Sequence, residues 1–203
     1  MQRFIKPAIF LLCLIPLGLG IWAGVTDQLS ANPIKEITHR TGDWSLRFLL
    51  ITLAVTPVRR ITGWSWLVRY RRMLGLFAFF YVCLHFLTYF VLDQFFDFGE
   101  IAKDIIKRPY ITVGFTAFVL LIPLALTSTN KMQRRLGKRW KQLHQLVYVI
   151  GVLGVLHYMW LVKADYLPPL IHAVILIALL AVRAWYQRRG NDRAGLKVNT
   201  ASS

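Results

Sequence analysis

Residues 73–92 read MLGLFAFFYVCLHFLTYFVL, a run of twenty residues without Asp, Glu, Lys or Arg. A helix of about 20 apolar residues is what crosses the hydrocarbon core of a bilayer. The run carries one ionisable imidazole, His85, in its second half. Ionisable side chains inside a span are costly and are functional candidates by default. This stretch therefore predicts a transmembrane helix with a functional histidine.

Five further apolar runs cover 7–25, 44–58, 110–127, 143–162 and 167–186. The run 44–58 is short and contains Arg47, but an even number of spans agrees with the charge distribution described next. The first run resembles a signal peptide, although five later spans favour an uncleaved helix. Of the 203 residues, 56% are apolar and 17% charged, against about 25% charged in soluble domains. We expect an all-α, polytopic membrane protein: a six-helix transmembrane bundle over 1–190 and a disordered cytoplasmic tail over 191–203.

The net charge of +16 comes from Lys and Arg that are unevenly distributed among the loops, and this distribution indicates the topology. When the loops are assigned to alternate sides, one side receives eighteen Lys and Arg with one acid, and the other six Lys and Arg with eight acids. Cation-rich loops are cytoplasmic by the positive-inside rule. Both termini are therefore expected in the cytoplasm, and the charge needs no nucleic-acid partner.

Two short helices are expected in the outer loops. Asn32 and Pro33 are suited to the N-cap and first position of a helix that would end near Arg40. Residues 98–107 have the pattern of an amphipathic helix on the outer face. No internal repeat is evident. Cys13 and Cys83 each lie in an apolar run and are expected to be small core residues, not a disulfide or a metal site.

Several kinds of chemistry have no motif in the chain. There is no Gly-x-Gly-x-x-Gly turn, Walker loop, Gly-x-Ser-x-Gly elbow or His-Glu-x-x-His. No acidic residue lies deep within an expected span, which argues against a carboxylate pathway for protons or cations. The histidines and Arg47 are therefore the remaining candidates for functional residues within the spans.

Two histidines are expected at similar depth on different spans. His85 is 13 residues past Arg72 and His157 is 16 residues past Lys141, both counted from the cytoplasmic side. Their depths differ by about one helical turn or less. Two neutral imidazoles on facing helices suit the axial positions of a haem iron. The alternative is that each bonds a neighbouring helix.

The sequence leaves two alternatives open for His144 and for Arg47. His144 lies 13 residues before His157 on the expected fifth span. That spacing suits a second stacked haem. However, His144 is expected at the membrane edge, where an exposed imidazole costs little. Arg47 could pair with a haem propionate, or extend to the outer headgroups. His172 is expected to be a packing or supporting residue, and His39 a solvated loop residue.

Several stretches resemble the MsrQ (YedZ) family, the haem-binding membrane subunit of the periplasmic methionine sulfoxide reductase system. They are NPIKEITHRTG at 32–42, TPVRR at 56–60, RRMLGL at 71–76, Tyr81 with His85, KRPYITVG at 107–114 and WKQLHQLVY at 140–148. They cover nearly the whole chain.

This resemblance implies a ferric-reductase-like transmembrane fold in the bacterial inner membrane. It implies that His85, His144 and His157 are haem-linked metal ligands, that haem b is bound, and that a flavin mononucleotide (FMN) is bound by residues it does not place. The implied partner is a periplasmic molybdopterin-containing reductase that repairs methionine sulfoxide. The implied electron donor is the quinone pool, a cytosolic flavin reductase, or both.

One departure bears on the haem count. Related oxidases place two histidines about fourteen residues apart on the third span, but fourteen residues before His85 stands Arg71. One haem is therefore expected, and a second would need another ligand. With no nucleotide-binding domain, the chain is interpreted as an electron-transfer subunit, not a self-sufficient enzyme. The alternatives are a quinol-linked cytochrome b anchor of another dehydrogenase and a cofactor-free membrane transporter.

Overall fold

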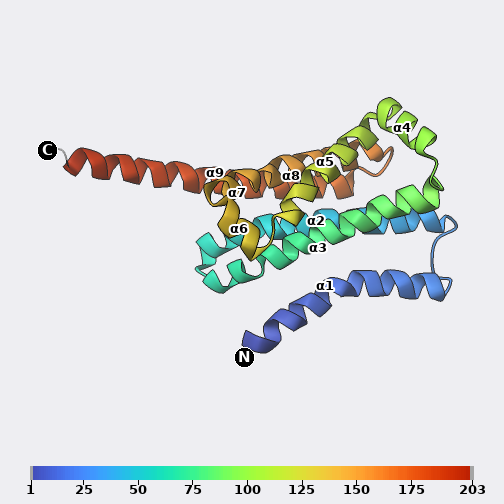
Figure 1. Cartoon of the computed structure of the whole chain (residues 1–203), viewed down its shortest axis with the longest axis horizontal. Coiled ribbons are helices and arrows are strands. Elements are labelled where there is room, and N and C mark those ends of the chain that lie inside the picture. Colours follow the sequence, from blue (N-terminus) through green and yellow to red (C-terminus); the bar gives the residue numbers. More distant parts are fainter. Residues whose placement is uncertain (1, 202–203) are drawn as a thin grey trace.

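The computed structural model describes the backbone of residues 2–201 and the side chains of residues 4–189. Over that range the chain is a bundle of helices without strands (Figure 1). The helices are α1 Gln2–Val25, α2 Pro33–Thr62, η1 Ser65–Arg69, α3 Arg71–Leu87, η2 Thr88–Asp93, α4 Phe98–Lys107, α5 Pro109–Leu126, α6 Asn130–Leu136, α7 Lys138–Leu143, α8 Leu146–Leu161 and α9 Leu167–Ala201. The all-α polytopic fold is as predicted.

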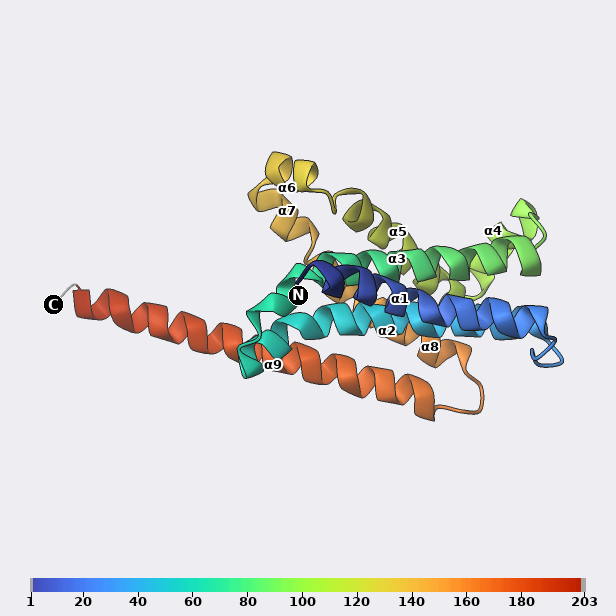
Figure 2. The ribbon, with the colours of Figure 1, turned by 90° about the horizontal axis from the view of Figure 1, so that it is seen from below.

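Five stretches of helix are long and apolar enough to cross a membrane. They are Phe4–Val25, Arg71–Asp93, Pro109–Leu126, Lys138–Leu161 and Leu167–Arg189. The remaining predicted span, 44–58, falls in α2, which is not among these five stretches but lies within the bundle beside α3 (Figure 2). The boundary at residue 190 and the disordered tail over 191–203 stay predictions. The α9 backbone is described to Ala201, and residues 202 and 203 lie outside the described part.

Helix α2 differs from the sequence prediction of a short loop helix followed by a short span. It is one helix of 30 residues, capped by the Asn32 side chain, which accepts a hydrogen bond from the Lys35 amide at 3.1 Å. Two ion pairs at i,i+4 spacing, Glu36–Arg40 and Asp43–Arg47, join charged residues on its surface. Such pairs support a helix across a polar stretch, so the residues expected as a loop continue the span.

A second difference lies before α8. The fifth span was expected to run unbroken from 143 to 162, but α7 ends at Leu143 and α8 begins at Leu146. His144 caps the C-terminus of α7. His144 therefore lies at a break between α7 and α8, and it does not share one continuous helix with His157.

Tyr81 of α3 joins α1 to the core. Its ring is 1% exposed, and its hydroxyl donates to the Cys13 carbonyl at 2.9 Å and accepts from the Leu17 amide at 3.1 Å. These two groups would ordinarily bond each other within α1. Pro16 lies between them. An inserted side chain and a proline are two recognised causes of a helix bend, and α1 is visibly bent in Figure 1. Cys13 and Cys83 are free thiols.

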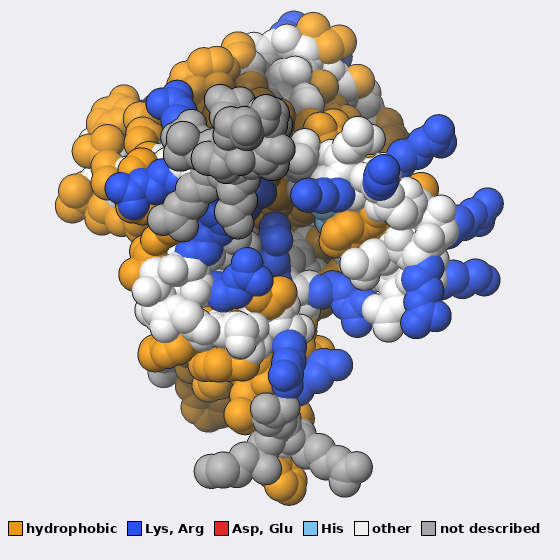
Figure 3. Space-filling model, turned by 90° about the vertical axis from the view of Figure 1, so that its left-hand side faces the viewer, with side chains coloured by type: hydrophobic (Ala, Val, Ile, Leu, Met, Phe, Trp, Pro, Cys, Tyr) orange, Lys and Arg blue, Asp and Glu red, His pale blue; other side chains and the backbone are white. Residues whose placement is uncertain are grey.

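Lys and Arg gather at one end of the bundle. Figure 3 looks onto that end, whose surface carries many Lys and Arg side chains. Both chain termini lie toward the same side (Figure 1). The opposite end carries α4, whose bounds are those predicted and which is capped by the Asp97 carboxylate at the amides of Gly99 and Glu100. This two-ended distribution agrees with the loop assignment made from the sequence.

Candidate functional site

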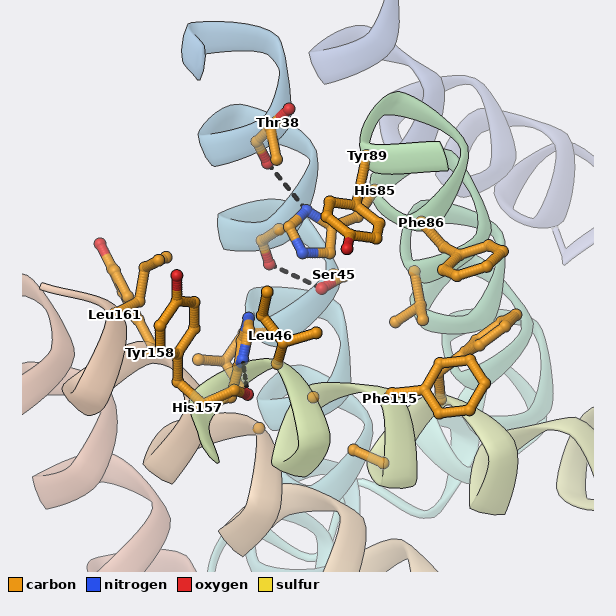
Figure 4. Close-up of a pocket in the computed structure, with 18 of the residues that line it drawn as sticks. Thr38, Ser45, Leu46, His85, Phe86, Tyr89, Phe115, His157, Tyr158 and Leu161 are labelled. Atoms are coloured by element: carbon orange, nitrogen blue, oxygen red, sulfur yellow. Dashed lines mark hydrogen bonds between the residues drawn. The ribbon is translucent and has the colours of Figure 1, made fainter. Parts of the chain in front are cut away.

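A cavity of about 520 Å³ lies inside the bundle between α2, α3, α5 and α8. Its volume is in the range of pockets that hold cofactors. Apolar side chains form most of its wall, and they include Leu46, Val82, Phe86, Phe115, Phe118 and Ile150. His85 enters from α3 and His157 from α8 (Figure 4). The fold thus brings together two histidines that are 72 positions apart in the sequence.

The two imidazoles have the separation of axial ligands. Their ring centres are 6.1 Å apart and their planes are inclined by 74°. Metal–imidazole bonds of about 2 Å, with about 1 Å from each nitrogen to its ring centre, place two ligands of one metal about 6 Å apart. Among the described side chains, no group of three or more His, Cys, Asp or Glu could hold a bare metal ion. A porphyrin, which supplies four nitrogens itself, fits two histidines better.

A backbone carbonyl fixes each imidazole. His85 Nδ1 donates to the Thr38 carbonyl at 2.9 Å, and His157 Nδ1 donates to the Tyr110 carbonyl at 2.7 Å. A carbonyl can only accept, so Nδ1 carries the proton in both rings and Nε2 keeps its lone pair. The described residues provide no hydrogen-bond partner for either Nε2. This arrangement holds ligating histidines in metal sites.

A glycine lies against each histidine. A Cβ atom on Gly42 of α2 would be 3.0 Å from His85 Nδ1, and one on Gly114 of α5 would be 2.6 Å from His157 Nδ1. Each glycine follows the hydrogen-bonded carbonyl by four residues, one helical turn. The missing side chain lets the imidazole reach that carbonyl. Sequence reasoning missed this role, although both glycines lie in stretches that carry the family resemblance.

These contacts reveal an internal repeat that was not evident from the sequence. The carbonyl, glycine and histidine at positions 38, 42 and 85 recur at 110, 114 and 157. In each unit the first helix holds the glycine and the second the histidine, and the helices pack together as α2 with α3 and α5 with α8. The cavity therefore lies between two similar helical hairpins. Short shared strings such as Leu84-His85 and Leu156-His157 are a weak sequence signal of this repeat.

The cavity has a polar mouth near α4. Lys35, His39, Asp93 and Arg108 line it. Arg108 Nε lies 3.1 Å from the Asp104 carboxylate. Desolvation is the largest single influence and lowers the pKa of the Arg108 guanidinium, but Asp104, Tyr110 and Tyr89 together raise it by more, and the net shift is upward. His39, expected in a solvated loop, lies on α2 at this mouth and is exposed.

Arg47 does not line the histidine cavity. Its NH2 atom is 2.6 Å from the Asp43 carboxylate, and its guanidinium lies 4.8 Å from the centre of the Trp44 ring. The side chains of Arg47 and Trp44 line a second cavity, between α2 and α9. The structure therefore separates Arg47 from His85 and His157.

His144 is also apart from the other two histidines. Its ring stacks on Trp140 with centres 3.9 Å apart, and Nδ1 donates to the Trp140 carbonyl at 3.1 Å. Nε2 lies 3.4 Å from the Ser128 hydroxyl. His144 is not among the side chains that line the two cavities described. Both of its nitrogens already have protein partners.

Comparison with known proteins decides the family. Residues 41–155 match the family described as "Ferric reductase like transmembrane component". The chain is 59% identical to the "Protein-methionine-sulfoxide reductase heme-binding subunit MsrQ" of Rhodospirillum rubrum, over 95% of this chain and 94% of that protein. The chain belongs to the MsrQ family. The MsrQ subunit of Herminiimonas arsenicoxydans is 57% identical over 93% of this chain and 89% of that protein.

The MsrQ subunit of Ralstonia nicotianae is 52% identical over 93% of this chain and 88% of that protein. No solved structure matches the chain. The MsrQ relatives therefore match both hairpins of the histidine cavity, since their alignments extend over nearly the whole sequence.

Proposed function

We propose that this chain is a haem b-binding membrane electron-transfer subunit that supplies electrons to a periplasmic methionine sulfoxide reductase. The observation that carries the proposal is the pair His85 and His157, 6.1 Å apart, with both Nδ1 atoms bonded to carbonyls. The names of the MsrQ relatives, each a heme-binding subunit of a protein-methionine-sulfoxide reductase, support it.

The side chains of the cavity would each have a definite task. His85 and His157 would hold the haem iron through their Nε2 atoms, and the carbonyls of Thr38 and Tyr110 would hold the Nδ1 protons and orient the rings. A bound haem supplies one-electron chemistry, as its iron alternates between ferric and ferrous states. The apolar walls exclude water and so tune the potential of the site.

Haem carries two propionates, and the mouth of the cavity offers cations for them. Lys35 and Arg108 line the mouth, and a guanidinium matches a carboxylate well. We assign the propionate contacts to these two residues in preference to Arg47, which faces the other cavity. The only cysteines, Cys13 and Cys83, are not in a Cys-x-x-Cys-His sequence, so a non-covalent haem of the b type is favoured over haem c.

One haem per chain is proposed. His144, the remaining candidate ligand, is bonded to Trp140 and Ser128, and it has no second histidine opposite it among the described side chains. FMN remains part of the proposal through the family resemblance alone, without assigned ligands.

The proposed partner is a periplasmic, molybdopterin-containing reductase, and the proposed donor is the quinone pool or a cytosolic flavin reductase. The basic end of the bundle, with both termini, would face the cytoplasm of a bacterium and the α4 end the periplasm. The histidine cavity opens toward α4, which supports electron exit at the outer face.

The test is an absorption spectrum of the purified full-length protein. A Soret band, with sharp split visible bands on reduction and about one haem per chain, is expected. A protein purified intact from haem-replete cells without any haem absorption would refute the proposal and favour the cofactor-free transporter.

A further inference from the structure

A second cavity, of about 630 Å³, lies between α2 and α9. Its rim is apolar and exposed on the outside of the bundle, where lipid would be: Ile51, Leu167, Ile171 and Ile175 are 45%, 65%, 49% and 42% exposed. Its lining also includes Asp43 and His172, whose side chains are 23% and 9% exposed, and Arg47, which is 46% exposed at the edge. Intramembrane ionisable groups that face a cavity mark ligand or proton pathways.

The polar groups of this cavity are arranged to hold a proton. His172 is 7% exposed, and its Nδ1 donates to the Pro168 carbonyl at 2.7 Å. Its Nε2 lies 3.4 Å from an Asp43 carboxylate oxygen. Because Nδ1 already carries a proton, Nε2 and the carboxylate oxygen face each other as two acceptors that an incoming proton can bridge. Arg47, 2.6 Å from the other oxygen, balances the carboxylate charge.

The second cavity adjoins the histidine cavity. Asp43 and Tyr158 line both of them. Asp43 follows Gly42, which packs against His85, and Tyr158 follows His157. The Tyr158 ring is also 5.7 Å from that of His172. A ligand in the second cavity would thus be separated from the proposed haem by a wall of two residues.

We propose that this cavity is a quinol-oxidation site, with Asp43 and His172 as the groups that take up protons. The inference rests on the proposed function and adds a site for its electron donor. A quinol is an apolar ring with two hydroxyl groups that arrives through the lipid, which matches an apolar lipid-facing rim and a polar interior. An anionic lipid headgroup suits the site less well, because Arg47 is already neutralised by Asp43.

Each proton and electron released by quinol oxidation has an acceptor next to the cavity. Oxidation breaks two O–H bonds of the quinol and forms two C=O bonds, releasing two protons and two electrons. The protons leave one at a time through the Asp43–His172 pair to the outer side. A haem held by His85 and His157 would accept the two electrons one at a time and pass each to the external reductase.

The experiment uses the full-length haem-loaded protein in phosphatidylcholine nanodiscs with decylubiquinol as the probe. The variants are Asp43→Asn, His172→Gln and, as a matched control, Glu36→Gln, which alters the other i,i+4 ion pair of α2 and lines neither cavity. Asp43→Asn and His172→Gln should slow haem reduction about 100-fold. The spectrum of His172→Gln and its reduction by dithionite should not change, and Glu36→Gln should behave as the unmutated protein. The rate of Asp43→Asn is compared per bound haem, because Asp43 also lines the histidine cavity.

A further variant, Ile171→Trp, fills the cavity from its exposed rim. It tests whether the cavity binds quinone even if the polar variants lose haem. It should weaken decylubiquinone binding, measured by equilibrium dialysis, and slow haem reduction. Wild-type binding and wild-type reduction rates in Ile171→Trp, or wild-type rates in both haem-loaded polar variants, would overturn the inference. A wild-type protein without haem would instead refute the proposed function, and the dialysis would still decide whether the cavity binds quinone.

Discussion

Gly114 lies so close to His157 that a methyl group in its place would be 2.6 Å from the Nδ1 atom of the imidazole. Real Cβ atoms do not approach that closely, so the imidazole position depends on the glycine. Gly42 has the same relationship to His85 at 3.0 Å. Both contacts place a ring beside the carbonyl that binds its Nδ1 proton.

Gly114→Ala should displace His157 and lower haem occupancy, and the haem that remains should have a shifted midpoint potential. Alanine in a helix is otherwise favourable by about 1 kcal/mol, whereas overpacking costs about 1–3 kcal/mol. Gly42→Ala should act in the same direction but less strongly, since its contact is longer. Haem content per chain and redox titration measure both effects.

The matched control is Gly18→Ala, because a Cβ atom there would have no neighbour within 4 Å. It should leave the spectrum and potential unchanged. If Gly114→Ala has the haem content and potential of Gly18→Ala, the glycine does not position His157.

His144→Ala should keep the full haem content and low-spin spectrum. The ring of His144 stacks on Trp140, and its two nitrogens have Trp140 and Ser128 as partners. Only a modest loss of thermal stability is expected, about 1 kcal/mol for a lost hydrogen bond. Loss of half of the haem in this variant would instead establish a second haem bound by His144.

The topology predicts opposite reporter activities at the two ends of the bundle. Fusions after Arg60 and Arg135 should report the cytoplasm, and a fusion after Asp97 the periplasm, because the Lys- and Arg-rich end faces inward. Periplasmic activity at either basic loop would invert the orientation and the direction of electron exit.

The acidic outer segment should take part in docking of the reductase. Asp93, Asp97 and Glu100 are exposed, and electron-transfer partners meet through weak interfaces steered by charge. Asp93→Asn, Asp97→Asn and Glu100→Gln combined should slow haem reoxidation by the purified partner about tenfold at low salt. High salt should remove the difference.

Asp104 is left out of that variant for a structural reason. It is 8% exposed and bonded to Tyr89 and Arg108, so Asp104→Asn would test stability, not docking. Equal rates and equal salt dependence for the triple variant and the unmutated protein would exclude this segment from the interface.

The membrane fold could be predicted because it depends on composition and on runs of apolar residues, which are local properties. The run 73–92 and α4 were located correctly in this way. The sequence did not predict that α2 is one continuous helix. Its charged residues suggest a loop, but they are paired along the helix, as Asp43 is with Arg47.

The candidate site was only partly predictable. The depths of His85 and His157 could be counted from the span ends, and the structure does bring their rings together. Gly42 and Gly114 could not be identified, because their role depends on which helices pack together. Arg47 was a candidate for the same cavity, but its direction around α2 places it on the other one.

The central claim is that His85 and His157 bind one haem between them, and the absorption spectra of His85→Ala and His157→Ala test it most directly. Both variants should be purified intact beside His144→Ala. We expect each to lose the low-spin haem spectrum, because the iron would lack an axial ligand, while His144→Ala retains it. Wild-type spectra and haem contents in both His85→Ala and His157→Ala would contradict the account.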